Sequence, residues 1–309
     1  MVFVIGLALG TISDEHPARP AVTRGPWRVL QADFHAHTRI SDGFLSPPEL
    51  VIQASRRGLD VLAVTEHNLL FPAEIARWWS ELVGGPTILL GEEVTTRAWH
   101  LHAIGIHTRV SPSLPLAEVI DEIHRQGGLA IAAHPVKRFW SSFLPVLDRL
   151  DGAEVMHPLS LRARPSASGW SGGDLVAFFD EALARGKRLT AIGSSDYHFG
   201  AALGRPRTLV FARSDAAEDV MDALRAGRTV VKLPDDRLVG DPACVAAITK
   251  DPLPPGMWEA PAREVGLLDR IGRALGVLGL VGLVALGRGG RRKGPELSAL
   301  RAGSPTSGA

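Results

Sequence analysis

The sequence "ADFHAHTRISDG" (residues 32–43) places two histidines and an aspartate at the end of an apolar run. His35 and His37 are two residues apart, so in a strand both imidazoles point to the same face and can bind one cation. Asp42 follows in the loop beside Gly43, where it could equally serve as a turn residue. By itself the stretch predicts a metal site only if other segments bring further ligands.

Short β-rich runs alternate with helical stretches from about residue 28 to residue 235, which predicts βα units of an α/β protein around a parallel sheet or barrel. The expected strands are "WRVLQADFHAH", "LDVLAVTEH", "TILLGEEVTT", "HLHAIGI", "GLAIAAHP", "GAEVMHP", "LTAIGSSD" and "TLVFAR". Helices are expected at "PPELVIQASRRG" and near residues 72–83, 115–126, 173–185 and 215–226.

Five of these strands end in a histidine or a carboxylate, in "FHAH", "TEH", "GEE", "AHP" and "SSDYH". In closed α/β barrels the functional side chains collect at the C-terminal ends of the strands. We therefore expect these groups to share one rim. Imidazole and carboxylate together suit zinc, manganese or iron, and the single cysteine, Cys244, excludes a thiolate cluster.

In this order, "DFHAHTRISDG", "VTEHN", "GEEVTT", "AAHP" and "GSSDYH" resemble the motifs of the PHP (polymerase and histidinol phosphatase) metallohydrolase family, over about residues 30–235. The resemblance implies a distorted (βα)7 TIM-like barrel with a cluster of two or three divalent metal ions, Zn, Mn or Fe. It implies nine metal ligands: His35, His37, Asp42, His67, Glu93, His100, His134, Asp196 and His198.

The same resemblance implies how these ligands are grouped. One metal is assigned to His35, His37, Glu93 and Asp196, a second to Glu93, His100 and His134, and a third to Asp42, His67 and His198. Glu93 is preferred to Glu92 because the family shows glycine, any residue, then glutamate. His102 remains an alternative to His100, since both lie on one face of the same expected strand. Glu66 stands where the family usually has aspartate.

Such a cluster lowers the pKa of bound water, so that a metal-bridging hydroxide can attack a phosphate ester. The sequence therefore predicts a metal-dependent hydrolase, foremost a phosphoesterase, acting on a small molecule. The alternatives are hydrolysis of a non-phosphate ester, carbamate or amide, and a non-catalytic metal-binding barrel. His157 is the first candidate to protonate a leaving group, and Lys137 and Arg138 are the first to bind a phosphate, ahead of Arg205 and Arg207.

Composition does not favour nucleic acid as a partner. The 34 basic residues nearly balance the 33 acidic ones, and the seven tryptophans are scattered rather than interleaved with a basic stripe. The sequence sets neither the substrate nor the oligomeric state.

Outside the barrel (28–235) we expect an apolar N-terminal segment and leader (1–27), a proline-rich linker (236–263), a transmembrane helix (264–290) and a disordered basic tail (291–309). "MVFVIGLALG" lacks the basic residues that precede a secretory signal's core, so it is either a shortened signal or a membrane segment.

The expected transmembrane helix contains "ALGVLGLVGLVALG" (274–287), followed by the basic "RGGRRKG". The positive-inside rule would put that cluster in the cytoplasm, and so predicts a membrane-associated protein with an extracytoplasmic catalytic domain. The alternative is a helix packed on the domain, with a cytoplasmic location.

Overall fold

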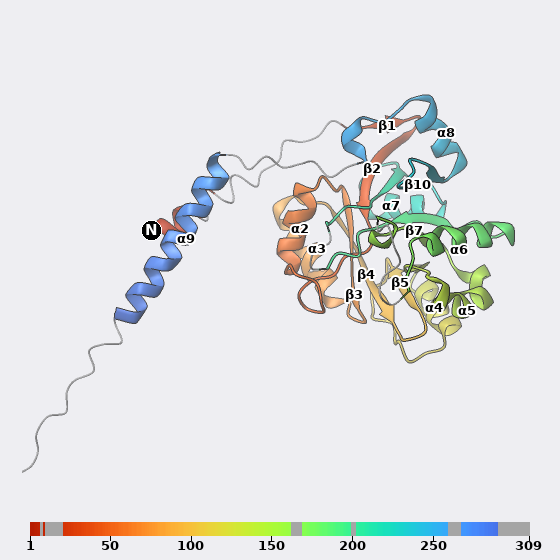
Figure 1. Ribbon diagram of the computed structural model, residues 1–309, viewed down its shortest axis with the longest axis horizontal. Helices are drawn as coiled ribbons and strands as arrows, with labels where there is room; N and C mark the ends of the chain where they lie inside the picture. The colour runs from red at the N-terminus through yellow and green to blue at the C-terminus, as the bar shows by residue number, and fades with distance from the viewer. Residues whose placement is uncertain (7–8, 10–20, 162–168, 199–201, 259–266, 290–309) are drawn as a thin grey trace, which may run out of the picture. The chain divides into compact units, whose positions relative to one another are not determined.

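The computed structural model describes residues 1–6, 9, 21–161, 169–198, 202–258 and 267–289 (Figure 1). The chain divides into two compact units. The larger unit comprises residues 16–262, and the smaller comprises the two chain ends, residues 1–15 and 263–309.

The larger unit is built on one sheet with the strand order β11-β10-β9-β2-β3-β4-β5-β6-β7-β8, and β1 pairs with β2. The strands are β1 (Thr23–Arg24), β2 (Trp27–Asp33), β3 (Val61–His67), β4 (Thr87–Thr95), β5 (His100–Ile104), β6 (Leu129–Ala132), β7 (Gly152–Met156), β8 (Thr190–Gly193), β9 (Thr208–Ala212), β10 (Thr229–Lys232) and β11 (Leu238–Gly240).

Two parallel segments, β2-β3-β4 and β6-β7-β8, are joined through β5, which is antiparallel to both of its neighbours. The expected alternation of strand and helix fails at this point. Only residues 96–99 separate β4 from β5, and a connection that short can only reverse the chain.

The ends of the sheet meet and nearly close it into a barrel. The Thr229 hydroxyl of β10 donates to the Ala191 carbonyl of β8 at 2.8 Å. The Gly193 amide of β8 donates to Thr208 Oγ1 of β9 at 2.9 Å. This barrel-shaped α/β sheet confirms the predicted fold class.

Helices surround the sheet in the larger unit. They are α2 (Pro47–Arg56), α3 (Phe71–Val83), α4 (Leu116–Arg125), α5 (Trp140–Phe143), α6 (Gly173–Ala184), α7 (Ala217–Arg225) and α8 (Pro242–Lys250), with short 3-10 turns η1 (Lys137–Phe139), η2 (Leu144–Arg149), η3 (Pro158–Leu161) and η4 (Pro255–Met257). Figure 1 shows α2 and α3 on one side of the strands and α4, α5 and α6 on the other.

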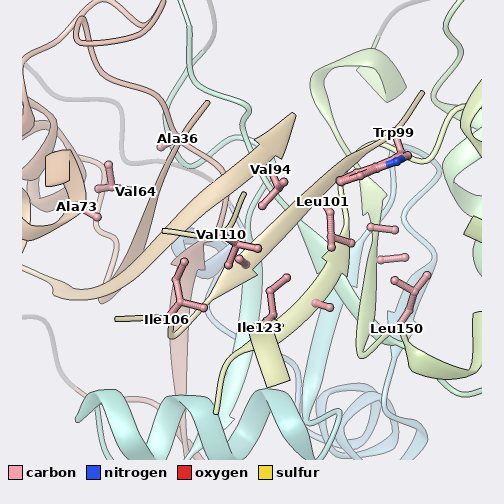
Figure 2. Packing of buried hydrophobic residues seen from close by; sticks show 14 of the residues in the cluster. Ala36, Val64, Ala73, Val94, Trp99, Leu101, Ile106, Val110, Ile123 and Leu150 are labelled. Atoms are coloured by element: carbon pink, nitrogen blue, oxygen red, sulfur yellow. The ribbon is translucent and has the colours of Figure 1, made fainter. Parts of the chain in front are cut away.

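Apolar side chains at helical spacing explain why the helices pack on the sheet. In α4, Val119, Ile120 and Ile123 are fully buried and belong to the cluster that also contains Leu101 and Leu150 (Figure 2). The packing of these faces against the strands buries the apolar surface that stabilises the unit.

A second apolar cluster fills the barrel where the parallel strands begin. Val61 and Leu129, the first residues of β3 and β6, belong to it together with Met221 and Leu224 of α7. Helix α7 therefore closes this end, and the polar strand ends lie at the opposite mouth.

Residues 236–258 differ from the expected linker, because they form β11, α8 and η4. The Asp241 side chain caps α8 by accepting from the Cys244 amide at 2.9 Å. Cys244 and Ile248 are buried in a cluster with Phe211 of the sheet. The prolines suggested a linker, but Pro242 lies in the first turn of the helix, where proline is tolerated.

The smaller unit contains α9 (Leu267–Gly289) and a short N-terminal helical segment, residues 2–6. The two helices approach closely through glycine. A Cβ atom on Gly6 would lie 2.4 Å from the Gly276 nitrogen, and one on Gly279 would lie 2.4 Å from the Phe3 nitrogen. Only residues without side chains permit this approach.

The predicted transmembrane helix at 264–290 is wrong. Within the described part of the chain, no helix is both long enough and apolar enough to cross a bilayer. Charged residues enter the first turns of α9, so its uncharged stretch covers only residues 274–287. That stretch is about 21 Å long, against roughly 30 Å of hydrocarbon. The membrane-associated location and extracytoplasmic orientation inferred from this helix are wrong with it. The expected tail, 291–309, lies outside the described residues.

Candidate metal centre

The nine predicted ligands come together at the mouth of the barrel. We call His35, His37, Glu93 and Asp196 the first group, Glu93, His100 and His134 the second group, and Asp42, His67 and His198 the third group. In each group side-chain nitrogen and oxygen atoms lie within a few ångströms of one another.

In the first group, four ligand atoms converge. His35 Nε2 lies 2.9 Å from His37 Nε2 and 3.0 Å from Asp196 Oδ1. Glu93 Oε2 lies 3.6 Å from both imidazole Nε2 atoms. His35, His37 and Glu93 are fully buried. The buried Glu93 Oε2 makes no hydrogen bond of acceptable geometry, although His67 Nδ1 lies 2.8 Å away, and a cation would complete its coordination.

The charge balance of the first group also favours a cation. Burial disfavours a charge on His35, but the carboxylates of Asp196, Glu154 and Glu93 outweigh it and raise the pKa of His35 well above its usual value. Burial would likewise raise the pKa of Glu93, yet His35, His100 and His134 hold it well below its usual value. The carboxylates thus require positive charge at this point, which divalent metal ions would supply.

In the second group, the other carboxylate oxygen of Glu93, Oε1, contacts two histidines. Glu93 Oε1 lies 2.8 Å from His100 Nδ1 and 3.1 Å from His134 Nε2. One carboxylate therefore faces both the first and the second group, as a bridging ligand does. Phe139 stacks on His100 and Trp170 on His134, with ring centroids 5.2 and 5.3 Å apart.

In the third group, Asp42 lies between two histidines. Its Oδ1 is 3.0 Å from His198 Nε2, and its Oδ2 is 3.3 Å from His67 Nε2. His198 Nδ1 is 2.9 Å from the Asp196 carbonyl, to which it can only donate, so neutral His198 would present an Nε2 lone pair to the carboxylate. Only a proton or a cation removes that repulsion, so these residues also fit a metal.

Comparisons with known proteins agree with this geometry. A family model described as PHP-associated matches residues 181–229, which include Asp196 and His198. A solved structure from Bacteroides vulgatus, described as a two-domain protein containing a predicted PHP-like metal-dependent phosphoesterase, has a TM-score of 0.57 at 21% identity and covers 76% of this chain and 74% of that chain. The fold and the matched segment are similar to those of PHP-domain proteins. The resemblance of the sequence motifs to this family is confirmed.

Two curated relatives match parts of this chain. An uncharacterized protein of Methanocaldococcus jannaschii is 29% identical over 143 residues, which cover 41% of this chain and 82% of that protein. A 5'-3' exoribonuclease of Haemophilus influenzae is 35% identical over 78 residues, covering 24% of this chain and 28% of that enzyme.

The structure distinguishes His100 from His102. Strand β5 is antiparallel, so His100, its first residue, lies at the barrel mouth, and His102 lies deeper. His100 contacts Glu93, whereas His102 Nε2 lies 3.3 Å from Glu154 Oε1. Of these two histidines, His100 is therefore the one that can share a metal ion with Glu93 and His134.

The three residues predicted to act on the substrate differ in position. His157 Nε2 lies 2.9 Å from Asp196 Oδ2, inside the centre. Arg138 lies over the rings of Phe139 and Trp170, at 4.9 and 5.6 Å. Lys137 lies over Trp140, 3.6 Å from its centroid. No ion pair or hydrogen bond links Lys137 or Arg138 to a predicted ligand in the described residues.

Two buried glutamates hold the ligands in place. In the sequence Glu66 stands out only as a departure from the family pattern, and sequence reasoning missed Glu154. Glu66 Oε1 accepts from the Thr38 amide at 2.6 Å, and its other oxygen accepts from the Ser41 hydroxyl, so it anchors the loop that carries Asp42. Glu154, within β7, contacts His35 and His102. A carboxylate in the middle of the apolar run "GAEVM" is the sequence signal that could have identified Glu154.

Proposed function

We propose that this PHP domain is a metal-dependent hydrolase of phosphate esters, with two or three divalent cations held by the three groups. The observation that carries the proposal is the bridging position of Glu93, whose two oxygens face different sets of imidazoles. The fold and family support it. Neither the identity nor the number of the metals follows from the ligand set, which suits Zn, Mn and Fe alike.

Divalent cations in such a centre act as Lewis acids toward phosphate oxygens and lower the pKa of water. The protein's part is to place the ligands rigidly. Glu93, His35 and His37 are fully buried, so their positions are set by the barrel rather than by mobile loops. Phosphoryl transfer depends mainly on such positioning and on positive charge.

His157 is the proposed proton donor to the leaving group. The Leu159 amide donates to His157 Nδ1 at 3.1 Å, so neutral His157 carries its proton on Nε2. That proton points to Asp196 Oδ2 at 2.9 Å, within the centre. The same hydrogen bond orients Asp196. A variant without the imidazole would therefore lose both the proton donor and the orientation of Asp196.

Arg138 is the better of the two proposed phosphate-binding residues. It is exposed, and it lies against the aromatic rings that cover the second group. Lys137 is directed onto Trp140 and would have to leave that ring to reach a substrate. We therefore expect substitution of Arg138 to raise KM for a phosphate ester more than substitution of Lys137 does.

The proposal is tested with full-length protein freed of metal and reloaded with Mn, Zn or Fe. The substrates are p-nitrophenyl phosphate, bis(p-nitrophenyl) phosphate and p-nitrophenyl acetate. We expect metal-dependent hydrolysis of a phosphate ester, abolished in the His35→Ala/His37→Ala double variant. Hydrolysis of the acetate alone would favour a carboxylic ester or amide substrate. Metal binding without any hydrolysis would favour a non-catalytic barrel.

A nucleic acid phosphodiester is the second candidate substrate, against the expectation from composition. The observation that favours it is the relative described as a 5'-3' exoribonuclease, which is 35% identical over 78 residues. A 5'-phosphorylated RNA oligonucleotide added to the same assay tests it. Release of nucleotides from the 5' end at a higher kcat/KM than for the small esters would establish RNA as the better substrate.

A further inference from the structure

The carboxylate of Glu154 is fully buried in the barrel, in a strand that is otherwise apolar. Burying a carboxylate is costly unless several partners stabilise it. Its partners belong to four different strands or strand ends: His35 Nδ1 at 2.9 Å, His102 Nε2 at 3.3 Å, the His134 amide at 2.5 Å and the Ser194 hydroxyl. Two of these partners are predicted metal ligands.

The contact with His35 decides which nitrogen of that ring faces the first group. An ionised carboxylate can only accept, so the hydrogen bond from Nδ1 to Glu154 Oε1 fixes the proton on Nδ1. Nε2 is then the nitrogen that faces His37 and Asp196, and in the neutral ring it carries the lone pair that a metal would bind. A carboxylate behind a histidine is the usual way in which proteins orient a metal-binding imidazole.

The contact with His134 acts on the backbone. His134 has a φ of +23°, a strained conformation that residues with side chains rarely adopt. Its amide donates to Glu154 Oε2, the oxygen not used by His35. This hydrogen bond holds the strained residue where its Nε2 lies 3.1 Å from Glu93 Oε1.

The third group is held by other residues. In the described part of the chain, Glu154 makes no hydrogen bond or ion pair with Asp42, His67 or His198. His67 Nδ1 lies 2.7 Å from Thr95 Oγ1, and the loop of Asp42 is anchored by Glu66. Replacing Glu154 should therefore change metal binding at the first and second groups and leave the third group unchanged.

We propose that Glu154 is a positioning residue that joins the first and second groups: one oxygen fixes His35 as an Nε2 ligand, and the other holds the backbone of His134. His102 completes the set, because its ring packs edge-on against His35, with centroids 4.1 Å apart, and its Nε2 contacts the same carboxylate. This inference rests on the proposed metal-binding function of the centre.

The test compares metal content and affinity in full-length variants. Glu154→Gln keeps the side-chain size but puts an NH2 group opposite either His35 Nδ1–H or the His134 amide. We expect metal affinity at the first and second groups to fall 10- to 100-fold, the range for residues behind metal ligands. Asp42→Asn is expected to weaken binding only at the third group, and the Asp42→Asn/Glu154→Gln double variant to show both effects. Glu92→Gln, a buried glutamate outside the groups, is the matched control.

A second measurement needs no variant at Glu154 and so does not depend on how that variant folds. Nitrogen-15 NMR of the histidine rings reports the tautomer of His35 directly, assigned by its loss in His35→Asn. We expect a protonated Nδ1 in the metal-free and metal-loaded protein. A proton on Nε2 alone, or Glu154→Gln protein that binds metal as wild type does, overturns the inference. Wild-type protein that binds no metal contradicts the proposed function instead, and the tautomer still tests the contact with Glu154.

Discussion

Glu92 and Glu93 are neighbours in β4, yet their carboxylates lie on opposite faces of the strand. Glu93 contacts His100 and His134 inside the barrel. Glu92 accepts a hydrogen bond from the Val110 amide on the outside. The alternation of side chains along a strand thus gives two adjacent, chemically identical groups different roles.

This difference predicts that the same substitution lowers metal affinity at Glu93 but not at Glu92. Glu93→Gln removes the negative charge between the first and second groups, so we expect it to lower metal affinity by more than about 100-fold, beyond the range for residues behind metal ligands. Glu92→Gln should leave metal content unchanged. Elemental analysis after dialysis against a weak chelator measures both. Equal metal loss in the two variants would contradict the bridging role of Glu93.

Glu92 also predicts how stability depends on pH. Burial raises its pKa from the usual 4.5 to about 7, so folding favours the protonated form. Its contribution to the free energy of unfolding therefore falls as pH rises from 4.5 through 7. Glu92→Gln removes this dependence and should stabilise the protein at pH 8 by about 1–3 kcal/mol, with little effect at pH 4.5. Urea unfolding at both pH values tests the difference.

The third group predicts histidine titrations in the metal-free protein. Burial lowers the pKa of His67, but Asp42 and Glu93 outweigh it and raise the pKa to about 9. Asp196 and Asp42 raise the pKa of His198 to about 10 in the same way. Asp42→Asn should lower both pKa values, although each ring keeps one carboxylate, Glu93 for His67 and Asp196 for His198. NMR titration measures them, and unchanged values would show that Asp42 does not lie between the rings.

Cys244 tests the packing of α8. The thiol is buried, and burial together with Asp241 raises its pKa to about 12. We therefore expect native protein to react with a disulfide reagent at pH 8 far more slowly than protein unfolded in guanidinium. Rapid labelling of the native protein would mean that α8 does not pack against the sheet, as the linker interpretation of this segment implied.

The strand-end motifs allowed much of the barrel and the ligand groups to be predicted, because a histidine after an apolar strand is a local signal. Glu154 could not be assigned in that way, since its partners are on strands that meet it only when the barrel closes. The choice between His100 and His102 depended on the reversed direction of β5. The membrane prediction failed because the uncharged stretch of α9 reaches bilayer length only if it is extended past Arg273, and the extension contains two more charges, Asp269 and Arg270.

Helix α7 closes one end of the barrel, because Met221 and Leu224 fill the end where the parallel strands start. Under the proposed function, cations and substrate would both reach the centre from the opposite mouth, and a bound substrate would lie over the cations. A non-hydrolysable phosphonate held at the mouth should therefore slow the escape of metal to a chelator, and stopped-flow measurement of that escape would reveal the trapping.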